Sequence, residues 1–231
     1  MACVLHAPLL AYAPMSKLPQ RTRIKICGIT RIQDAIDAAR LGVDALGLVF
    51  YPPSSRAIDL ERALRIREAL PAFVQAVGLF VNPARHEVEA VLQVFPELVL
   101  QFHGDETAEF CASFARPYLK ALPMGKTPGS AVLDVHGVMA QHSQASGFLL
   151  DSHAPGAVGG TGVAFDWSTI PQLERPLILA GGLNPANVGE AVRLVRPWAV
   201  DVSSGLESAP GVKDFSKMAE FVDEVRYADY S

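Results

Sequence analysis

The 231-residue sequence predicts an α/β fold, a (β/α)8 TIM barrel that forms a single domain. Three observations favour this architecture. Eight short apolar runs alternate with helix-like segments, each repeat takes roughly 26 residues, and no linker or composition shift divides the chain after residue 23. A doubly wound open sheet is the competing architecture, but no G-x-G-x-x-G follows the first predicted strand.

Each predicted strand is a short apolar run of the kind that a parallel sheet buries on both faces. In chain order the strands are 23–27, 43–50, 73–81, 97–102, 117–124, 146–151, 175–181 and 198–204. In the first strand, alternation places Lys25 and Cys27 on one face and Ile24 and Ile26 on the other.

Helical periodicity joins most of these strands. Apolar residues recur at i, i+3, i+4 and i+7 within 32–39, 88–95, 188–195 and 215–222. Weaker windows at 128–142 and 163–173 predict short or irregular helices.

Three sequence signals mark where helices begin. Thr30 with Gln33 predicts a capping box. Asn82-Pro83 and Asn184-Pro185 each predict an N-cap followed by proline at the first helical position.

Composition narrows the class of protein. Hydrophobic residues make up 50% of the chain and the net charge is −4, which indicates a soluble globular protein rather than a disordered one. No run approaches the roughly 20 apolar residues of a membrane-spanning helix, so we expect no membrane partner. The mild acidity argues against nucleic acid as a partner, because phosphate backbones favour a basic face.

The cysteines and the first residues bear on location and domain boundaries. The chain has three cysteines, Cys3, Cys27 and Cys111, and no C-x-x-C motif. We therefore expect neither a disulfide framework nor a metal site, and we expect a cytoplasmic location. Residues 1–22 are predicted to form a flexible N-terminal extension rather than a secretory signal, since no basic region precedes the apolar run. The catalytic barrel is predicted to span 23–231.

Barrel active sites form at the carboxyl ends of the strands. Gly181 and Gly182 end the seventh predicted strand, and the eighth ends in Ser203, Ser204 and Gly205. Glycines there let backbone N–H groups approach an anion, and a following helix N-terminus adds a favourable dipole. One such turn is usually only a tight connection, but these two together with the turn at Gly160 predict a phosphate site.

Cys27 and Asp151 end two other predicted strands, and Asp201 ends the AVD run within the eighth. A buried cysteine is commonly inert, and an aspartate there can simply cap a loop, but together they suit proton transfer on a phosphorylated small molecule. Lys25 should lie deeper in the barrel, either paired with an inward-facing acid or acting as a Schiff-base lysine; we favour the pair.

Arg56, Gln101 and His103 complete the polar set. Arg56 follows a rigid Pro52-Pro53 turn and either faces solvent or clamps a substrate carboxylate. His103 could act as a base, although a hydrogen-bonded histidine is the favoured interpretation. We place Gln101 and His103, with Arg56 and Asp201, among the candidate substrate-binding residues.

Several runs resemble the phosphoribosylanthranilate isomerase family of tryptophan biosynthesis, in order and over essentially all of 23–225. They are KICGITR, GLVFYPPSSRAI, VGLFVN, LQFHGDE, LLDSHAPGAVGGTGVAFDW, LAGGLNPANV and VDVSSGLESAPGVKD. The family often has proline where Ser55 stands, which leaves Arg56 in place.

The resemblance implies an isomerase that performs an Amadori rearrangement of a phosphorylated aminosugar without a cofactor. It implies that Cys27 is the general base and Asp151 the general acid. It also implies that Arg56 holds the anthranilate and that Asp201 assists near the ring. Gly182, Ser203 and Ser204 would bind the phosphate. Positive potential, from Lys25 or helix N-termini, would assist the Cys27 thiolate.

Two other functions remain open on the sequence: a Schiff-base aldolase or synthase that uses Lys25, and a catalytically inactive sugar-phosphate-binding barrel. The oligomeric state also stays open between a monomer and a homodimer.

Overall fold

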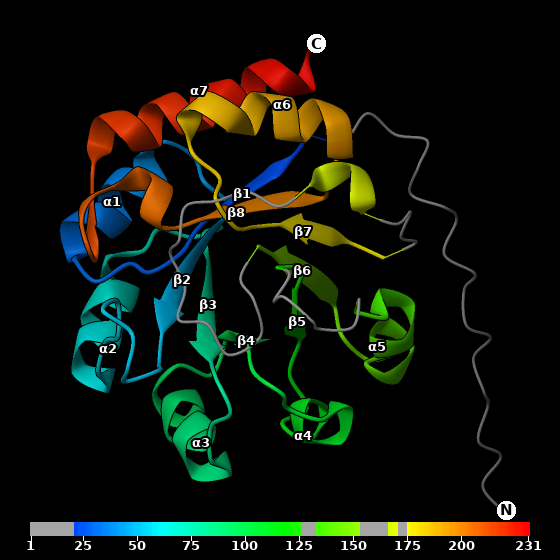
Figure 1. Ribbon diagram of the computed structural model, residues 1–231. Coiled ribbons are helices and arrows are strands. Elements are labelled where there is room, and N and C mark those ends of the chain that lie inside the picture. Colours follow the sequence, from blue (N-terminus) through cyan, green and yellow to red (C-terminus); the bar gives the residue numbers. More distant parts are fainter. Residues whose placement is uncertain (1–20, 126–132, 153–165, 171–174) are drawn as a thin grey trace, which may run out of the picture.

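A computed structural model describes residues 21–125, 133–152, 166–170 and 175–231 of the chain. Eight parallel strands pair in chain order and close into a barrel, which confirms the predicted fold (Figure 1). The strands are β1 (Arg23–Ile26), β2 (Ala45–Val49), β3 (Gln75–Phe80), β4 (Val99–Phe102), β5 (Tyr118–Pro123), β6 (Gly147–Asp151), β7 (Leu177–Leu179) and β8 (Ala199–Val202).

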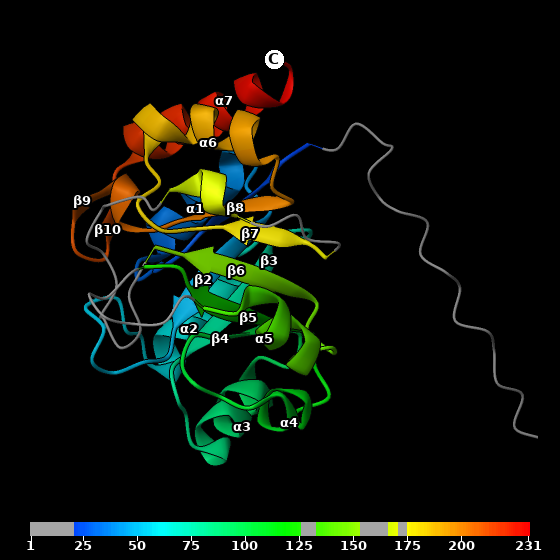
Figure 2. The same cartoon turned by 45° about the vertical axis from the view of Figure 1, so that its right-hand side comes forward.

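Helices surround the barrel. They are α1 (Ile32–Arg40), α2 (Leu60–Ala69), α3 (Arg85–Val94), α4 (Ala108–Ala112), α5 (Val135–Gln141), α6 (Pro185–Val195) and α7 (Phe215–Asp229), with 3-10 turns η2 (Trp167–Thr169) and η3 (Ser204–Leu206). α6 and α7 lie side by side in both views (Figures 1 and 2). A hairpin of β9 (Glu207–Ala209) and β10 (Val212–Lys213) separates η3 from α7.

The weak helical windows give short helices, as expected. The first contains α5 and the second η2, while 128–132, 163–165 and 171–173 lie outside the described residues.

The predicted start of α1 is wrong. Arg31 is the N-cap and makes no side-chain capping bond. The Thr30 hydroxyl instead donates to the Gly211 carbonyl oxygen at 2.5 Å, and the Gln33 amide donates to Asp37. The Thr30 hydroxyl therefore binds the loop of the β9–β10 hairpin, and this hydrogen bond takes the place of the predicted capping bond.

The two Asn-Pro signals have different outcomes. Asn184 is the N-cap of α6, with its side chain accepting from the Ala186 N–H, as predicted. Asn82 is not the N-cap of α3, because it has φ +46° and its Oδ1 accepts from the Asp105 N–H in the following loop. α3 begins at Arg85.

Two apolar layers follow from strand alternation. Outward-facing residues such as Ile24 and Ile26 pack under the helices, while a small inner layer fills the barrel. The fully or nearly buried members of the inner layer are Ala121, Leu149, Ile178, Ala180 and Ala199. Asp151 follows Leu149 by two positions in β6, and Asp201 follows Ala199 by two positions in β8, so both carboxyl groups lie above this inner layer.

The segment before β1 is joined to the end of the chain. Thr22 is buried, and its N–H and hydroxyl both donate to Asp229 at 2.8 and 2.7 Å. Residues 1–20 of the predicted extension lie outside the described residues. Within the described part of the chain, no helix combines the length and the apolar character needed to cross a membrane.

Candidate active site

Cys27 lies just beyond β1, directly above a buried ion pair. The Lys25 ammonium donates to the Asp201 carboxylate at 2.9 Å, with 5% and 7% of these side chains exposed. The two residues are opposite each other in the β1–β8 register. The expectation that Lys25 pairs with an inward-facing acid is therefore confirmed, and the acid is Asp201.

This pair controls the charge around the thiol. Burial raises the pKa of Cys27, and the positive charges of Lys25 and Lys213 oppose that rise. Burial lowers the pKa of Lys25, but the charges of Asp201 and Cys27 outweigh it and leave that pKa raised. The expected positive potential at Cys27 is present, but it does not overcome the cost of burying a thiolate, so the pKa of Cys27 stays raised.

Glycine makes room for the thiol. A Cβ atom on Gly47 of β2 would lie 2.5 Å from the Cys27 sulfur and 2.9 Å from its Cα. Any larger residue at this position would displace the sulfur.

Asp151 ends β6 and is buried. The Nε2 atom of His103 lies 3.2 Å from Asp151 Oδ2, and its Nδ1 atom lies 3.1 Å from the Gln101 amide nitrogen. Which of the two ring nitrogens donates depends on the tautomer of the imidazole. His103 is thus hydrogen-bonded on both sides, as predicted, and Gln101 is fully buried behind it.

Asp201 connects the two halves of this arrangement. Its charge raises the pKa of Cys27, and Asp151 and His103 both act electrostatically on Asp201. Leu149, two residues before Asp151, belongs to the inner layer, so Asp151 faces inward as Lys25 and Cys27 do. A thiol and a carboxyl group therefore share the carboxyl end of the barrel, with a charged pair between them.

Arg56 lies in the loop after β2 and is held rather than exposed. Its Nε and Nη2 atoms both donate to the Glu207 carboxylate at 2.7 Å, and 15% of its side chain is exposed. This bond raises the pKa of Arg56. Of the two sequence interpretations, free exposure to solvent is excluded.

The loops after β7 and β8 converge as the phosphate prediction requires. Gly181 and Gly182 have φ values of +81° and +68°, which only glycine adopts without strain. A Cβ atom on Gly205 would lie 2.0 Å from the Leu183 carbonyl oxygen, so the β8 loop packs directly on the β7 loop. α6 begins just beyond, at Pro185. Gly160 lies outside the described residues.

A second buried ion pair supports the loop that carries His103. Lys120 of β5 donates to Glu106 at 2.7 Å and to the Gly104 carbonyl oxygen at 2.5 Å. Glu106 also accepts from the N–H groups of Asn82 and Gly104. This contact network fixes the β4–α4 loop.

Sequence reasoning missed Glu207 and Lys213. The Lys213 ammonium is fully buried, donates to Glu207 at 2.9 Å and lies 3.1 Å from the Ser203 carbonyl oxygen. The one sequence signal that could have indicated these residues is that Glu207 and Lys213, which have opposite charges, lie within ten residues of the predicted phosphate loop.

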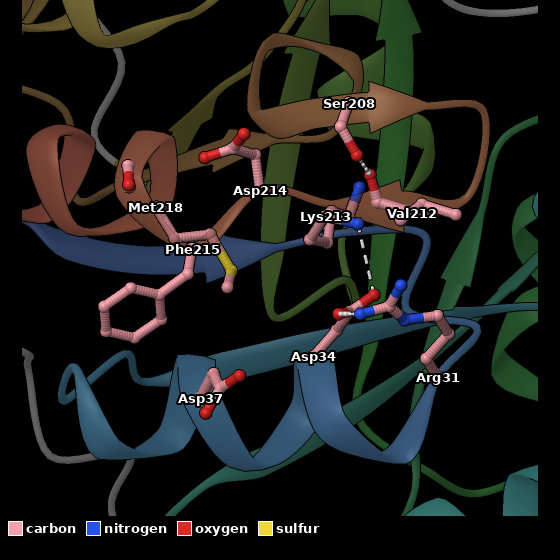
Figure 3. A pocket seen from close by; sticks show the side chains of 10 residues that line it. Arg31, Asp34, Asp37, Ser208, Val212, Lys213, Asp214, Phe215 and Met218 are labelled. Carbon is pink, nitrogen blue, oxygen red and sulfur yellow. Dashed lines mark hydrogen bonds and ion pairs between the residues drawn. The ribbon is translucent and has the colours of Figure 1, made fainter.

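A cavity of about 400 Å³ lies behind this cluster, between α1, the β9–β10 hairpin and the start of α7 (Figure 3). Its lining includes Arg31, Asp34 and Asp37 from one side and Lys213 and Phe215 from the other. Of the predicted site residues that the structure describes, none lines it. The predicted chemistry therefore belongs to the barrel end and not to this cavity.

The chain is similar to a protein family, to a curated relative and to solved structures. The model for N-(5'phosphoribosyl)anthranilate (PRA) isomerase matches residues 24–224. The N-(5'-phosphoribosyl)anthranilate isomerase of Pseudomonas aeruginosa strain UCBPP-PA14 is 55% identical over 205 residues, which cover 88% of this chain and 95% of the relative.

The structures agree with the sequence match. One is a phosphoribosyl anthranilate isomerase in complex with reduced 1-(o-carboxyphenylamino)-1-deoxyribulose 5-phosphate, at TM-score 0.75 and 38% identity, covering 89% of this chain and 99% of that one. Another describes monomers of the dimeric enzyme from Thermotoga maritima, at TM-score 0.75 and 37% identity, covering 89% and 98%.

Proposed function

The chain belongs to the N-(5'-phosphoribosyl)anthranilate isomerase family, and on that premise we propose that it catalyses the family's reaction in tryptophan biosynthesis. The reaction is the Amadori rearrangement of N-(5-phosphoribosyl)anthranilate to 1-(2-carboxyphenylamino)-1-deoxyribulose 5-phosphate. The observation that carries the proposal is the inward-facing thiol and carboxyl group at one end of a barrel whose last two loops suit a phosphate.

We assign the general acid to Asp151. It protonates the ribose ring oxygen, the C1–O bond breaks, and the anilino nitrogen lone pair forms a protonated Schiff base with C1. His103 contacts the Asp151 carboxyl group, and Gln101 orients the imidazole. These contacts hold the Asp151 carboxyl group in one orientation, which supports its role in proton transfer to the ring oxygen.

We assign the general base to Cys27. Its thiolate removes the proton from C2, and the electron pair moves through C1 to the cationic nitrogen to give an enolamine. Relaxation of the enolamine to the ketone, with protonation at C1, completes an isomerisation that balances without an external oxidant or reductant. The buried charge of Lys25 supports the thiolate when it forms.

The remaining assignments concern binding. Arg56 holds the anthranilate carboxylate, Asp201 acts near the ring, and Gln101 and His103 border the substrate. The phosphate is bound by backbone N–H groups and hydroxyls of the two converging loops, at Gly181, Gly182, Ser203, Ser204 and Gly205, with Gly160 from the preceding loop. The substrate is thus a small anionic molecule held by local donors, despite the net charge of −4.

The Schiff-base alternative is disfavoured by the state of Lys25. Its ammonium is buried against Asp201 and its pKa is raised, so it is held in the charged, non-nucleophilic form. Trapping of a substrate adduct on Lys25 by borohydride would reverse this conclusion.

The proposed activity is tested by the loss of substrate fluorescence on conversion, with complementation of a tryptophan auxotroph as the second readout. Turnover and growth are expected. A purified, folded protein that gives neither would refute the proposal and favour an inactive sugar-phosphate-binding barrel.

We also propose a cytoplasmic enzyme that is a monomer or a homodimer. The described cysteines, Cys27 and Cys111, are free thiols, and burial raises the pKa of Cys111 to about 12, so it is unreactive. Sedimentation of the purified chain distinguishes the two oligomeric states.

A further inference from the structure

Behind Arg56 lies a buried chain of charges that the proposed chemistry does not use. Arg56 is bound to Glu207, Glu207 to Lys213, and Lys213 to Ser203 of the β8 loop. Only 6% of the Glu207 side chain and none of the Lys213 side chain is exposed. Burying three charges costs free energy unless each charge has a hydrogen-bonded partner of opposite charge or a polar partner, so the positions of these three side chains are tightly constrained.

Glu207 occupies one edge of the Arg56 guanidinium. It accepts from Nε and Nη2, which form the side edge of the planar group. A guanidinium has five N–H donors in a fixed geometry. Among the described residues, neither Nη1 nor the second hydrogen of Nη2 has a hydrogen-bond partner, so this end edge of the group can take another carboxylate. Glu207 therefore orients Arg56 without using the edge that a substrate would take.

Lys213 changes the charge balance of this arrangement. Arg56 and Glu207 alone would sum to zero, and a second carboxylate would then meet a neutral pair. The buried ammonium of Lys213 balances Glu207 and leaves the positive charge of Arg56 available. Burial raises the pKa of Glu207, but hydrogen bonds from Arg56 and the charge of Lys213 outweigh it and leave that pKa lowered.

The position of Arg56 is set on its other side by Gly28. A Cβ atom on Gly28 would lie 2.5 Å from Arg56 Cδ and 3.0 Å from Ser203 Oγ, and Gly28 has φ +73°. The Arg56 side chain therefore crosses the residue next to Cys27 on its way to Glu207. The guanidinium stem is confined between the reacting end of β1 and the predicted phosphate loop.

Lys213 itself is anchored from outside the barrel. Its backbone N–H donates to Asp34 Oδ2 at 3.1 Å, and Asp34 is held by Arg31 at 2.8 Å (Figure 3). Asp34 is buried in α1, so the hairpin that carries Lys213 is fixed against a helix. The ammonium is consequently placed by rigid elements on both sides.

We propose that Glu207 and Lys213 are positioning residues that orient Arg56 and preserve its charge for the aromatic carboxylate of the substrate. The inference rests on the proposed function, because it concerns the ligand of the same site. It predicts that the two residues act on recognition of the carboxylate and not on binding of the rest of the molecule.

The test compares two ligands by calorimetry. The first is reduced 1-(o-carboxyphenylamino)-1-deoxyribulose 5-phosphate, and the second is the same compound without the ring carboxyl group. In the unmodified chain the carboxylated ligand should bind about 10- to 100-fold more tightly, the range for a charge-assisted bond. Glu207→Gln and Lys213→Met should each reduce this ratio by about tenfold while affinity for the second ligand stays within about threefold.

The two variants act for different reasons, which makes the test two-sided. Glu207→Gln keeps the shape but presents an amide N–H₂ to an Arg56 donor, so the guanidinium loses its orientation. If Glu207 only competed for Arg56, this variant would raise the ratio, and that result would overturn the inference. An unchanged ratio in both variants, or an equal loss for both ligands, would also overturn it.

Two controls keep the inference separate from folding and from the proposed function. Asp229→Asn disrupts a part-buried carboxylate at the amino end of β1, where it accepts from the Thr22 N–H and hydroxyl, and should leave the ratio unchanged. In a chain that already carries Arg56→Lys, no guanidinium is left for Glu207 to orient. Adding Glu207→Gln to that chain should therefore have little further effect on the ratio of the two affinities. An unmodified chain that binds neither ligand would refute the proposed function itself, whereas normal selectivity in every variant would refute only this inference.

Discussion

Gly47 offers a sharp test of whether the position of the Cys27 sulfur matters for turnover. A Cβ atom in Gly47→Ala would lie 2.5 Å from that sulfur, about 1 Å closer than an ordinary contact, and 2.9 Å from the Cys27 Cα. The backbone atom cannot rotate away, so the thiol and the end of β1 must shift by about 1 Å. A displacement of this size at a reacting group can lower the rate about 100-fold.

The assay is kcat from substrate fluorescence, with unfolding by urea measured alongside. Gly47→Ala should lower kcat by about 100-fold and cost about 1–3 kcal/mol of stability through overpacking. Gly78→Ala in β3 is the matched control, because its Cβ atom would lie 2.5 Å from Cδ2 of Leu98, a residue of the outer apolar layer just before β4. It should lose comparable stability but keep kcat within about twofold. Equal kcat values for the two variants would refute the reasoning.

Other predictions concern charge, binding and helix capping. Lys25→Met should move the pH dependence of Cys27 alkylation to higher pH, because the ammonium that lowers the thiol pKa is gone; a profile that stays in place or moves down would contradict this. The measurement uses a chain in which Cys27 is the only cysteine. Arg56→Ala should raise KM by about 10- to 100-fold with a smaller change in kcat, and an unchanged KM would exclude the clamp. Asn184→Ala removes the α6 cap and should cost about 1 kcal/mol, or about 3 °C in Tm; an unaltered Tm would mean that the capping bond contributes nothing.

The barrel was predictable because each strand is identified by residues within the strand itself. Alternation in β1 also placed Lys25 beside Cys27, and the cost of an unpaired buried ammonium required an acidic partner. The partner could not be identified locally, because Asp201 faces Lys25 only when β8 closes on β1.

Contacts between distant segments explain the predictions that failed. Thr30 lost its capping role to Gly211, a residue 181 positions away in the chain. The roles of Glu207 and Lys213 could not be predicted locally, because the β9–β10 hairpin brings these residues to Arg56. Arg56 and Glu207 are 151 positions apart in the chain. The raised pKa of Cys27 likewise comes from burial by the closed barrel, which no local motif reports.

The most direct test of the assigned chemistry is turnover of N-(5-phosphoribosyl)anthranilate by Cys27→Ala and by Asp151→Asn, each compared with the unmodified chain. Both variants should fold and retain substrate affinity, and each should lose at least about 10²- to 10⁴-fold in kcat, the range for losing a general base or a general acid. A near-normal rate in either variant would contradict the account, because the proton that the missing group is assigned to move would then be moved by another residue.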